Sequence, residues 1–397
     1  MPDATPASIF QQPARRRAFA TKVENANALS RGGLRELAFL FLKLGTTAFG
    51  GPAAHVAMME EEIVSRRRWL SREKFLDLLG ATNLIPGPNS TEMAIHIGYL
   101  RAGWPGLLVA GACFIVPATL SVGALAWAYV RFGALPQAEA LLWGVKPVVI
   151  AVVLQALWSL ARSVVRSPLH AAVAAAALAA SLAGINELLL LAAAGAAAAA
   201  ARAWKGRQAG SLALLASAAP AAAVPLTLTG LFLFFLKVGS VLFGSGYVLL
   251  AFLRADLVSR WHWLTESQLL DAVAAGQMTP GPVFTTATFI GYVLAGWRGA
   301  AVATLGIFLP AFVFVAASGP LVARVRRSAP AGAFLDGVNA GSLALMAAVT
   351  LQLARSALVD GWTVGIAAAA ALLLIRLRVS SAWLLPAGAL LGLVVRG

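Results

Sequence analysis

Lysines inside apolar sequence are the first residues of this chain whose type and spacing could do chemistry. Lys43 and Lys237 each lie in an apolar stretch, seven residues before Gly50 and Gly244. A charge inside a membrane segment is costly and usually faces an interior pathway. The pair therefore predicts an anion site, the alternative being that both side chains reach out to the membrane surface. Lys146 is a third lysine in an apolar stretch, and it has no lysine counterpart.

Glycine and proline interrupt two of the apolar stretches, and both interruptions occur twice. The first break is Phe49-Gly50-Gly51-Pro52, and its counterpart is Phe243-Gly244-Ser245-Gly246. The second is Pro86-Gly87-Pro88, matched by Pro280-Gly281-Pro282. Two prolines around a glycine cannot continue a regular helix. Non-helical backbone at membrane depth is tolerated only where protein or water satisfies it.

Polar residues follow the second break in each case. Asn89-Ser90-Thr91 and Thr285-Thr286 are predicted to be N-caps of half-helices, whose free amides and partial positive charge attract anions. Two such ends that converge would suit a small tetrahedral oxyanion; the alternative is that the breaks are kinks needed for packing. The predicted substrate-binding set is Lys43, Lys237, Gly50, Gly51, Gly244, Asn83, Gln277, Pro86, Gly87, Pro88, Asn89, Ser90, Thr91, Thr279, Pro280, Gly281, Pro282, Thr285 and Thr286.

Glu92 lies one turn after the first Pro-Gly-Pro break, where it could carry a coupling proton or pair with a lysine. The four histidines, at positions 55, 96, 170 and 262, are scattered, and no catalytic constellation is found. A single Cys113 excludes an intrachain disulfide and a cysteine-based metal cluster. We therefore expect no enzyme, no cofactor and no metal.

Composition defines the class of protein that must position these residues. Of 397 residues, 60% are hydrophobic and 12% are charged, half the usual ~25% of a soluble domain. The fold class expected is an all-α, polytopic integral membrane protein. The 31 basic and 16 acidic residues give a net charge of +15, which in a membrane protein reports cytoplasmic loops and does not require nucleic acid. A basic cytoplasmic tail is predicted over residues 1–33.

Apolar stretches of about membrane length form two sets that are copies of each other. Phe49 and Phe243 are 194 residues apart (243 − 49), and the same offset aligns the two Pro-Gly-Pro breaks. After a one-residue deletion the offset is 193, which aligns Pro117 with Pro310. Duplicated membrane proteins with broken segments are mostly secondary transporters that bind substrate near the midplane. The predicted repeats are 34–210 and 227–397, joined by a linker at 211–226, with about 10–12 membrane segments in all.

Charge predicts that the repeats are inverted. The Arg66-Arg67-Arg68 loop comes only one segment after the basic tail, so both are cytoplasmic only if the Gly50 segment is a re-entrant hairpin. Five crossings per half would then invert the second repeat, provided that the Pro-Gly-Pro segment crosses. A second hairpin there would make the halves parallel.

The sequence around these breaks resembles a known family. FGGPAAHVAMMEEE and WLSREKFLDLLGATNLIPGPNSTEMAIHIGYLRAGWPG are similar to the N-terminal half of the chromate ion transporter family, in its long two-domain form. FGSGYVLLAFLRADLV and WLTESQLLDAVAAGQMTPGPVFTTATFIGYVLAGWRGA are similar to its C-terminal half. The family motif residues present are Gly50, Gly51, Pro52, Pro86, Gly87, Pro88, Gly98, Gly103, Gly244, Pro280, Gly281 and Pro282.

The resemblance implies export of chromate across the cytoplasmic (inner) membrane of a prokaryote, which confers chromate resistance. Sulfate is the tetrahedral analogue of chromate and stays open as a second substrate. The alternatives are a permease or exchanger for another oxyanion, or a membrane-embedded enzyme or lipid-carrier flippase. A coupling proton or counter-anion and a homo-oligomer also stay open.

Overall fold

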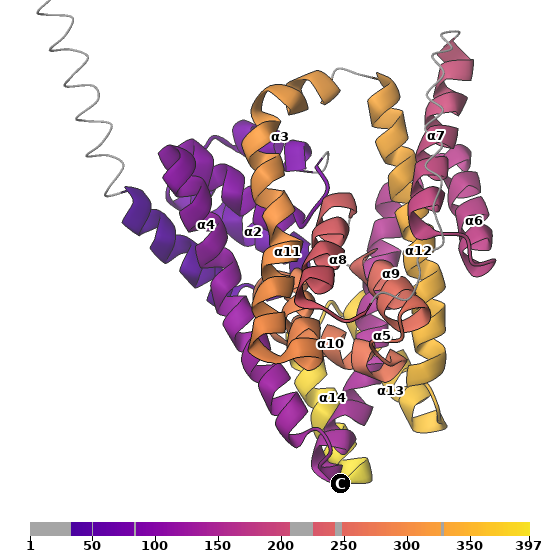
Figure 1. Ribbon diagram of the computed structural model, residues 1–397. Helices are drawn as coiled ribbons and strands as arrows, with labels where there is room; N and C mark the ends of the chain where they lie inside the picture. Colours follow the sequence, from indigo (N-terminus) through magenta and orange to yellow (C-terminus); the bar gives the residue numbers. More distant parts are fainter. Residues whose placement is uncertain (1–32, 50, 83–84, 207–224, 243–247, 327–328) are drawn as a thin grey trace, which may run out of the picture.

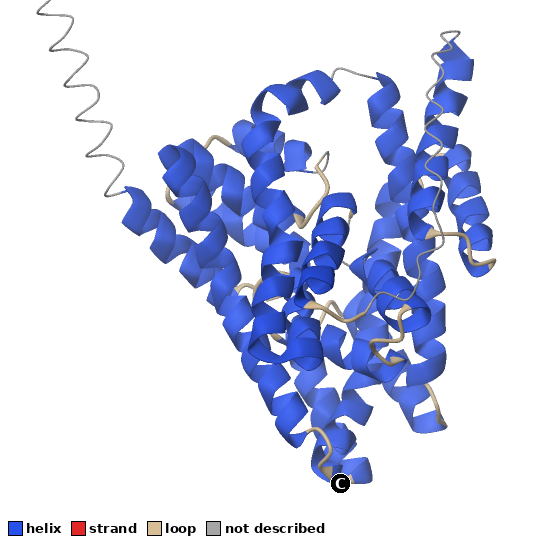
Figure 2. Cartoon of the chain, viewed as in Figure 1, coloured by secondary structure: helices blue, strands red, loops and turns tan. Residues whose placement is uncertain are grey.

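The computed structural model describes residues 33–49, 51–82, 85–206, 225–242, 248–326 and 329–397. Every regular element in these ranges is helical (Figure 2). Except for Gly33, Pro225 and Leu226, the predicted tail 1–33 and linker 211–226 lie outside the described residues.

The two halves contain matching series of helices. The first half opens with a helix at 33–47 and continues with α2 (Gly51–Glu60), the π-helix η1 (Glu61–Arg66), α3 (Arg72–Thr82), α4 (Asn89–Phe132), α5 (Pro136–Val164), α6 (Pro168–Leu182) and α7 (Glu187–Gly206). The second half contains α8 (Leu228–Val241), α9 (Leu249–Leu253), the π-helix η3 (Arg254–Arg260), α10 (Glu266–Met278), the short 3-10 helix η4 (Val283–Thr285), α11 (Thr286–Arg326), α12 (Ala329–Ala357), α13 (Gly361–Ile375) and α14 (Ser381–Arg396).

α4 and α11 are each a hairpin of a short and a long helical arm. In α4 the backbone leaves helical geometry at Ala102 and at Gly103, whose φ of 62° favours glycine. Gly98 and Gly106 then touch through their backbones, although eight residues of straight helix would separate them by about 12 Å. α11 reverses in the same way at Ala295 and Gly296. The short arm that follows each Pro-Gly-Pro break therefore turns back to begin a long spanning arm.

The Gly50 segment is a re-entrant hairpin, as the basic loop predicted. Lys43 on the first helix pairs with Glu62 on η1 at 2.8 Å, and Glu36 near the start of that helix pairs with Arg67 at 3.6 Å. The first helix thus lies beside the end of η1, so the chain reverses direction between them. Arg101, at the end of the short arm of α4, also pairs with Glu36, at 3.7 Å. The Pro-Gly-Pro segment is therefore a second hairpin that opens to the same side.

The repeats are inverted. The long arm of α4 packs on the long arm of α11, its counterpart in the other repeat: Gly111 lies against Phe312, and a methyl on Gly123 would be 3.0 Å from the Trp297 ring. Residue numbers rise along α4 while those of the contacting residues in α11 fall, so the two equivalent arms are antiparallel (Figure 1). The second pair of hairpins consequently opens to the opposite side of the molecule.

The expectation that two hairpins per half would make the repeats parallel was wrong. α7 runs against α12, with Leu191 near Gly341 and Ala194 near Gly337, so α7 ends where α11 ends and α12 begins. α8 runs along the long arm of α11, with Gly239 near Pro310, so it starts where that arm starts. Gly206 and Leu228 therefore lie on opposite sides of the molecule.

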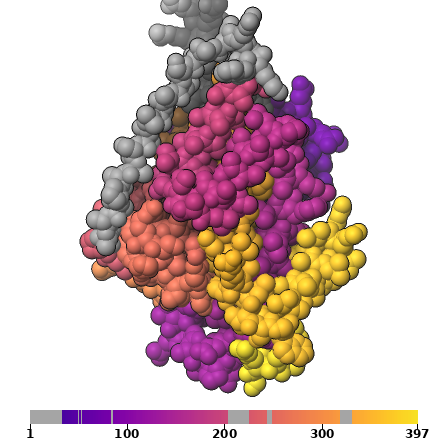
Figure 3. Space-filling model, turned by 90° about the vertical axis from the view of Figure 1, so that its right-hand side faces the viewer, coloured from indigo at the N-terminus to yellow at the C-terminus, as the bar shows by residue number. Residues whose placement is uncertain are grey.

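Within the described part of the chain, four helices are long and apolar enough to cross a membrane: Asn89–Phe132, Pro136–Val164, Val283–Ala317 and Pro330–Ala357. Shorter apolar helices pack on them as hairpins. The backbone of Gly144 on α5 touches that of Gly388 on α14, a close approach typical of small residues in membrane helices. Figure 3 shows α6 and α7 in the upper part of one face and α13 and α14 lower on that face. The chain is a multi-pass membrane protein.

Candidate functional site

The chain breaks of the two repeats cross at the centre of the molecule. The Gly87 N–H donates to the carbonyl of Leu242, at the end of α8, at 2.7 Å. The Gly281 N–H donates to the carbonyl of Ala48, at the end of the first helix, at 2.9 Å. These bonds are equivalent under the repeat. Each Pro-Gly-Pro loop is thus held by the residue at the end of the first helix of the other half, and two short arms begin at this point.

Glycine is required at the middle of each loop. Gly281 has φ +94°, and a methyl on it would be 2.7 Å from the methyl of Ala118 on α4. Gly87 has φ +139°, and a methyl on it would collide with the Glu92 carboxyl and come within 3.8 Å of Ala311 on α11. Since Ala118 and Ala311 are themselves equivalent, each loop packs on the long arm of the opposite repeat. The four breaks form one unit.

Proline, and not the predicted asparagine or threonine, occupies the N-cap positions. Pro88 precedes α4 and Pro282 precedes η4, and neither end has a side-chain cap. A proline ring supplies no side-chain acceptor, so the first turns are capped by no side chain. Asn89 is instead the first residue of α4, and Thr285 is the last of η4.

In the first half, Ser90, Thr91 and Glu92 after the break are buried, and Asn89 is half-buried. The Ser90 hydroxyl contacts Nδ1 of His55 at 3.3 Å, and Nε2 of His55 contacts the Ala48 carbonyl at 3.0 Å. Thr91 and Glu92 are both 0% exposed. The Thr91 hydroxyl and both oxygens of the Glu92 carboxyl have no hydrogen-bond partner. Buried polar atoms are normally paired, so this cluster is a candidate for binding a ligand.

The corresponding side chains of the second half are satisfied by their own backbone. The hydroxyl of Thr279 donates to Ala275 at 3.1 Å, that of Thr285 to Pro282 at 2.8 Å, and that of Thr286 to Val283 at 2.8 Å. Gln277 is 7% exposed, its amide nitrogen has no partner, and it lines a very small cavity with Thr286. The first repeat therefore contributes most of the unpaired polar groups at the breaks. Of the other predicted site residues, Gly51 begins α2, Pro86 and Pro280 are partly buried in their loops, and Gly50, Asn83 and Gly244 lie outside the described residues.

The two predicted lysines lie in ion-pair clusters some distance from the breaks. Lys43 pairs with Glu62 at 2.8 Å and Lys237 with Asp256 at 2.7 Å, at equivalent positions of η1 and η3. Glu62 is eleven residues beyond the start of α2 at Gly51, or about 16 Å along a helix. The lysine head groups are therefore displaced toward the open end of each hairpin.

Sequence reasoning missed the acidic partners and the arginines that complete these clusters. Glu62 also binds Arg67, and Asp256 also binds Arg260. The offset of 194 residues places Glu62 on Asp256, so the repeat contained a signal for both. Each carboxylate thus holds at least two cations. The Lys43 cluster has one basic side chain more than acidic ones, with Lys43, Arg66, Arg67 and Arg101 against Glu36, Glu61 and Glu62. The Lys237 cluster is balanced, because Arg260 also lies 3.9 Å from Glu187.

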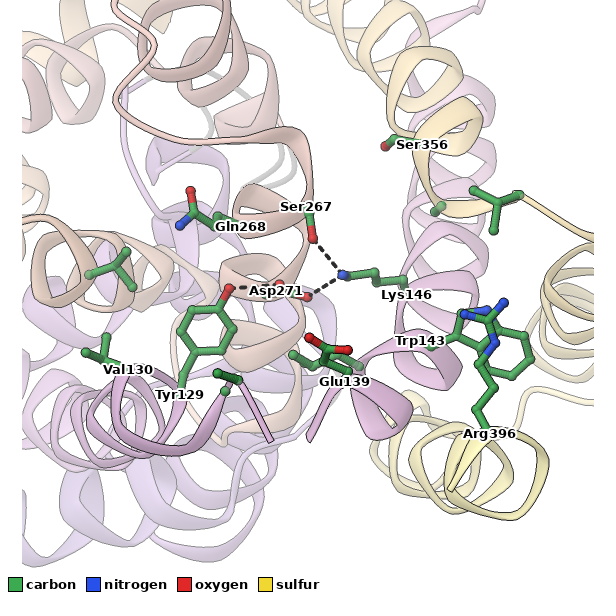
Figure 4. A pocket seen from close by; sticks show the side chains of 16 residues that line it. Tyr129, Val130, Glu139, Trp143, Lys146, Ser267, Gln268, Asp271, Ser356 and Arg396 are labelled. Carbon is green, nitrogen blue, oxygen red and sulfur yellow. Dashed lines mark hydrogen bonds and ion pairs between the residues drawn. The ribbon is translucent and has the colours of Figure 1, made fainter. Parts of the chain in front are cut away.

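The third intramembrane lysine bridges the two repeats beside a cavity of about 670 Å³. Lys146 on α5 donates to Ser267 at 2.7 Å and pairs with Asp271 at 3.2 Å, both on α10 (Figure 4). The Tyr129 hydroxyl, at the far end of α4, donates to the other oxygen of Asp271 at 3.1 Å. The position equivalent to Lys146 is Asn339, so the second repeat has no lysine at this point.

An inverted pair of repeats whose broken helices meet at the centre defines a secondary-transporter architecture. Comparison with known proteins agrees with this class. The chain matches the chromate transporter family in two segments, residues 35–223 and 229–393, and it belongs to that family.

Three bacterial relatives cover most of the chain. It is 34% identical to the chromate transport protein of Cupriavidus metallidurans, over 91% of this chain and 93% of the relative. It is 33% identical to the chromate transport protein of Pseudomonas aeruginosa, over 79% and 80%. It is 31% identical to the probable chromate transport protein of Synechococcus elongatus, over 82% and 86%. No solved structure matches the chain.

Proposed function

We propose that this protein transports chromate out of the cell across the cytoplasmic membrane and thereby confers chromate resistance. The observation that carries the proposal is the crossing of the chain breaks, which brings two short helical arms to one central point between inverted repeats. Helix starts that no side chain caps attract a tetrahedral oxyanion. Family membership and the names of the relatives support chromate as that oxyanion.

The substrate site that we propose lies at the start of the short arm of α4. Ser90 and Thr91 are buried hydroxyl donors there, and the Thr91 hydroxyl has no partner. Gly87 and Gly281 allow the backbone to approach closely because they have no side chain. In the second repeat, Gln277 and Thr286 line a very small cavity that is otherwise apolar.

The ion-pair clusters are proposed to guide the anion toward this site. Inversion places the Lys43 cluster toward one side of the membrane and the Lys237 cluster toward the other. The Lys43 cluster keeps an excess of one basic side chain, which raises the local concentration of an anion. In the balanced Lys237 cluster, the positive group offered to an anion is the partly exposed Lys237 ammonium itself. The lysines therefore act at the approaches, and the helix ends act at the centre.

Membrane voltage favours the outward direction. One charge that moves through 100 mV changes its energy by ~2.3 kcal/mol, and a dianion by roughly twice that. Export from a cell with a negative interior is therefore electrically downhill, whereas uptake would need coupled cations.

Flux of chromate into or out of proteoliposomes that contain the purified protein tests the function. Saturable chromate flux, absent from empty vesicles, is expected. If the protein moves sulfate but not chromate, sulfate takes the place of chromate as the substrate. If it moves neither anion, the protein is not an oxyanion transporter, and a membrane enzyme or flippase is the remaining alternative.

The role of the lysines is tested by Lys43→Ala and Lys237→Ala, with Lys74→Ala as a matched control on the exposed face of α3. We expect both cluster variants to lose most flux at unchanged protein level, and the control to keep it. Lys43→Ala combined with Glu62→Gln separates two explanations. Restored flux would mean that the lysine only neutralises Glu62, and would remove it from the anion pathway.

A further inference from the structure

Glu92 is a carboxyl group in the centre of the protein without a partner of either charge. It is 0% exposed, and neither of its oxygens makes a hydrogen bond. One oxygen lies close to Gly87 in the Pro-Gly-Pro loop, beside the start of α4. Burying an ionised carboxylate without a partner is strongly unfavourable, and such a group changes its protonation instead.

No lysine of the membrane segments neutralises this carboxyl. Each of the three is bound to a different carboxylate, 2.7–3.2 Å away: Lys43 to Glu62, Lys237 to Asp256 and Lys146 to Asp271. The pairing of Glu92 with a lysine, which the sequence left open, is therefore not found in the described chain. A proton is therefore the cation left to neutralise the Glu92 carboxyl.

The other charged and titratable groups on the elements around this arm have partners of their own. η4 and the short arm of α11 carry no charged side chain over residues 283–296. The groups present are His55 on α2, bonded to Ser90 and Ala48; Asp77 on α3; His96 one turn further along the arm; and Asp271 on α10, bonded to Tyr129 and Lys146.

We propose that Glu92 takes up one proton when the oxyanion binds and releases that proton with the oxyanion on the other side, where the open site lets water reach the carboxylate, so that each anion crosses the membrane together with one proton. In this arrangement the protonated carboxyl and the Thr91 hydroxyl donate hydrogen bonds to the anion. Both groups are fully buried, lack partners and occupy the first turn after the break. The inference deepens the proposed function, on which it rests.

Electrostatics gives the reason for such a proton. The energy of placing a charge in a medium of low dielectric constant rises steeply with that charge, so a dianion is especially costly to bury. With Glu92 ionised, a site occupied by a dianion would hold three negative charges, and a proton on Glu92 reduces that number to two. The second repeat has Thr285 and Thr286 in the corresponding region, and hydroxyls cannot supply a second exchangeable proton at this site. One proton per anion follows.

The experiment measures charge moved per anion in proteoliposomes at a fixed membrane voltage. Chromate is supplied in alkaline buffer, where it is a dianion in solution, and sulfate is run in parallel as a dianion that resists protonation. The wild-type protein should move one net charge per anion and should carry protons with it. Glu92→Gln keeps a neutral donor, so this variant should still transport but should move two charges and no proton.

Three outcomes are informative. Two charges per anion in the wild-type protein, or one charge per anion in Glu92→Gln, would overturn the inference. The wild-type ratio requires no variant, so it decides the matter even if Glu92→Gln does not fold. Absence of any anion flux in the wild-type protein would instead reject the proposed function, and so the two failures are distinguishable.

Discussion

Gly281→Ala should disrupt the crossing of the two repeats. Gly281 has φ +94°, donates its N–H to Ala48 at 2.9 Å, and leaves only 2.7 Å between an added methyl and the methyl of Ala118. Left-handed backbone costs an L-residue about 1–2 kcal/mol. Overpacking of a close contact costs typically about 1–3 kcal/mol more. The sum, about 2–5 kcal/mol, is a large share of the stability of a typical domain.

Gly103→Ala is the matched control. Gly103 also has positive φ, +62°, but no atom lies within 4 Å of a methyl placed there. This variant should lose only the backbone share, about 1–2 kcal/mol. The difference between the two variants therefore isolates the contact of Gly281 with the opposite repeat.

The assay combines thermal unfolding in detergent with chromate flux in proteoliposomes. Gly281→Ala should unfold at lower temperature than Gly103→Ala and lose most of its flux. Adding Ala118→Gly removes the opposing methyl at a cost of about 1 kcal/mol for glycine in a helix, and should restore part of the flux. If Gly281→Ala behaves like Gly103→Ala, or if Ala118→Gly brings no recovery, the close contact is not what holds the loops together.

Three further predictions follow from the described contacts. Single cysteines at Arg68 and His262, equivalent loop positions that share φ 54°, should be labelled from opposite sides of the membrane; labelling from one side would contradict inversion. Lys146→Ala and Asp271→Asn should each slow transport, and a double-mutant cycle should give non-additive effects because the two side chains are paired at 3.2 Å; additive effects would show that the bridge is not coupled to transport. The pKa of Asp360, in the loop before α13, is held below its usual value of 3.8 mainly by the Thr363 N–H in the first turn of that helix. The stability that this carboxylate contributes is therefore present above its unfolded pKa and is lost as pH falls through its folded pKa. Asp360→Asn should remove that part of the acid sensitivity in a thermal-unfolding series.

Much of the architecture could be predicted from the sequence because apolar length and repetition are local properties. The apolar stretches define the membrane helices, and the offset of 194 residues reveals the duplication before any contact is known. Pro86-Gly87-Pro88 and its counterpart had to break their helices, because proline lacks an N–H and glycine adopts dihedrals that other residues avoid. These conclusions need no tertiary information.

The sequence predicted the inverted orientation of the repeats, but the reason for that prediction was incomplete. Counting crossings led to inversion through five spans per half, whereas the structure has two hairpins per half, with Gly206 and Leu228 on opposite sides. Crossing counts depend on which apolar stretches return on themselves, and hydropathy is the same for a helix that crosses and for two short helices that turn back. Gly103 and Gly296 reverse the chain through dihedrals that no hydropathy pattern reports.

The sequence by itself determined the class of this protein, its duplication, the places where its helices break and the residues whose side chains could bind an anion or carry a proton. Only the tertiary structure decided which of those residues meet. It paired Lys43 and Lys237 with Glu62 and Asp256, and it left Glu92 at the centre without a cation. The physical reason is that charge pairing depends on distances of a few ångströms between segments that the chain itself separates by many residues, and those distances exist only once the two repeats have packed against each other.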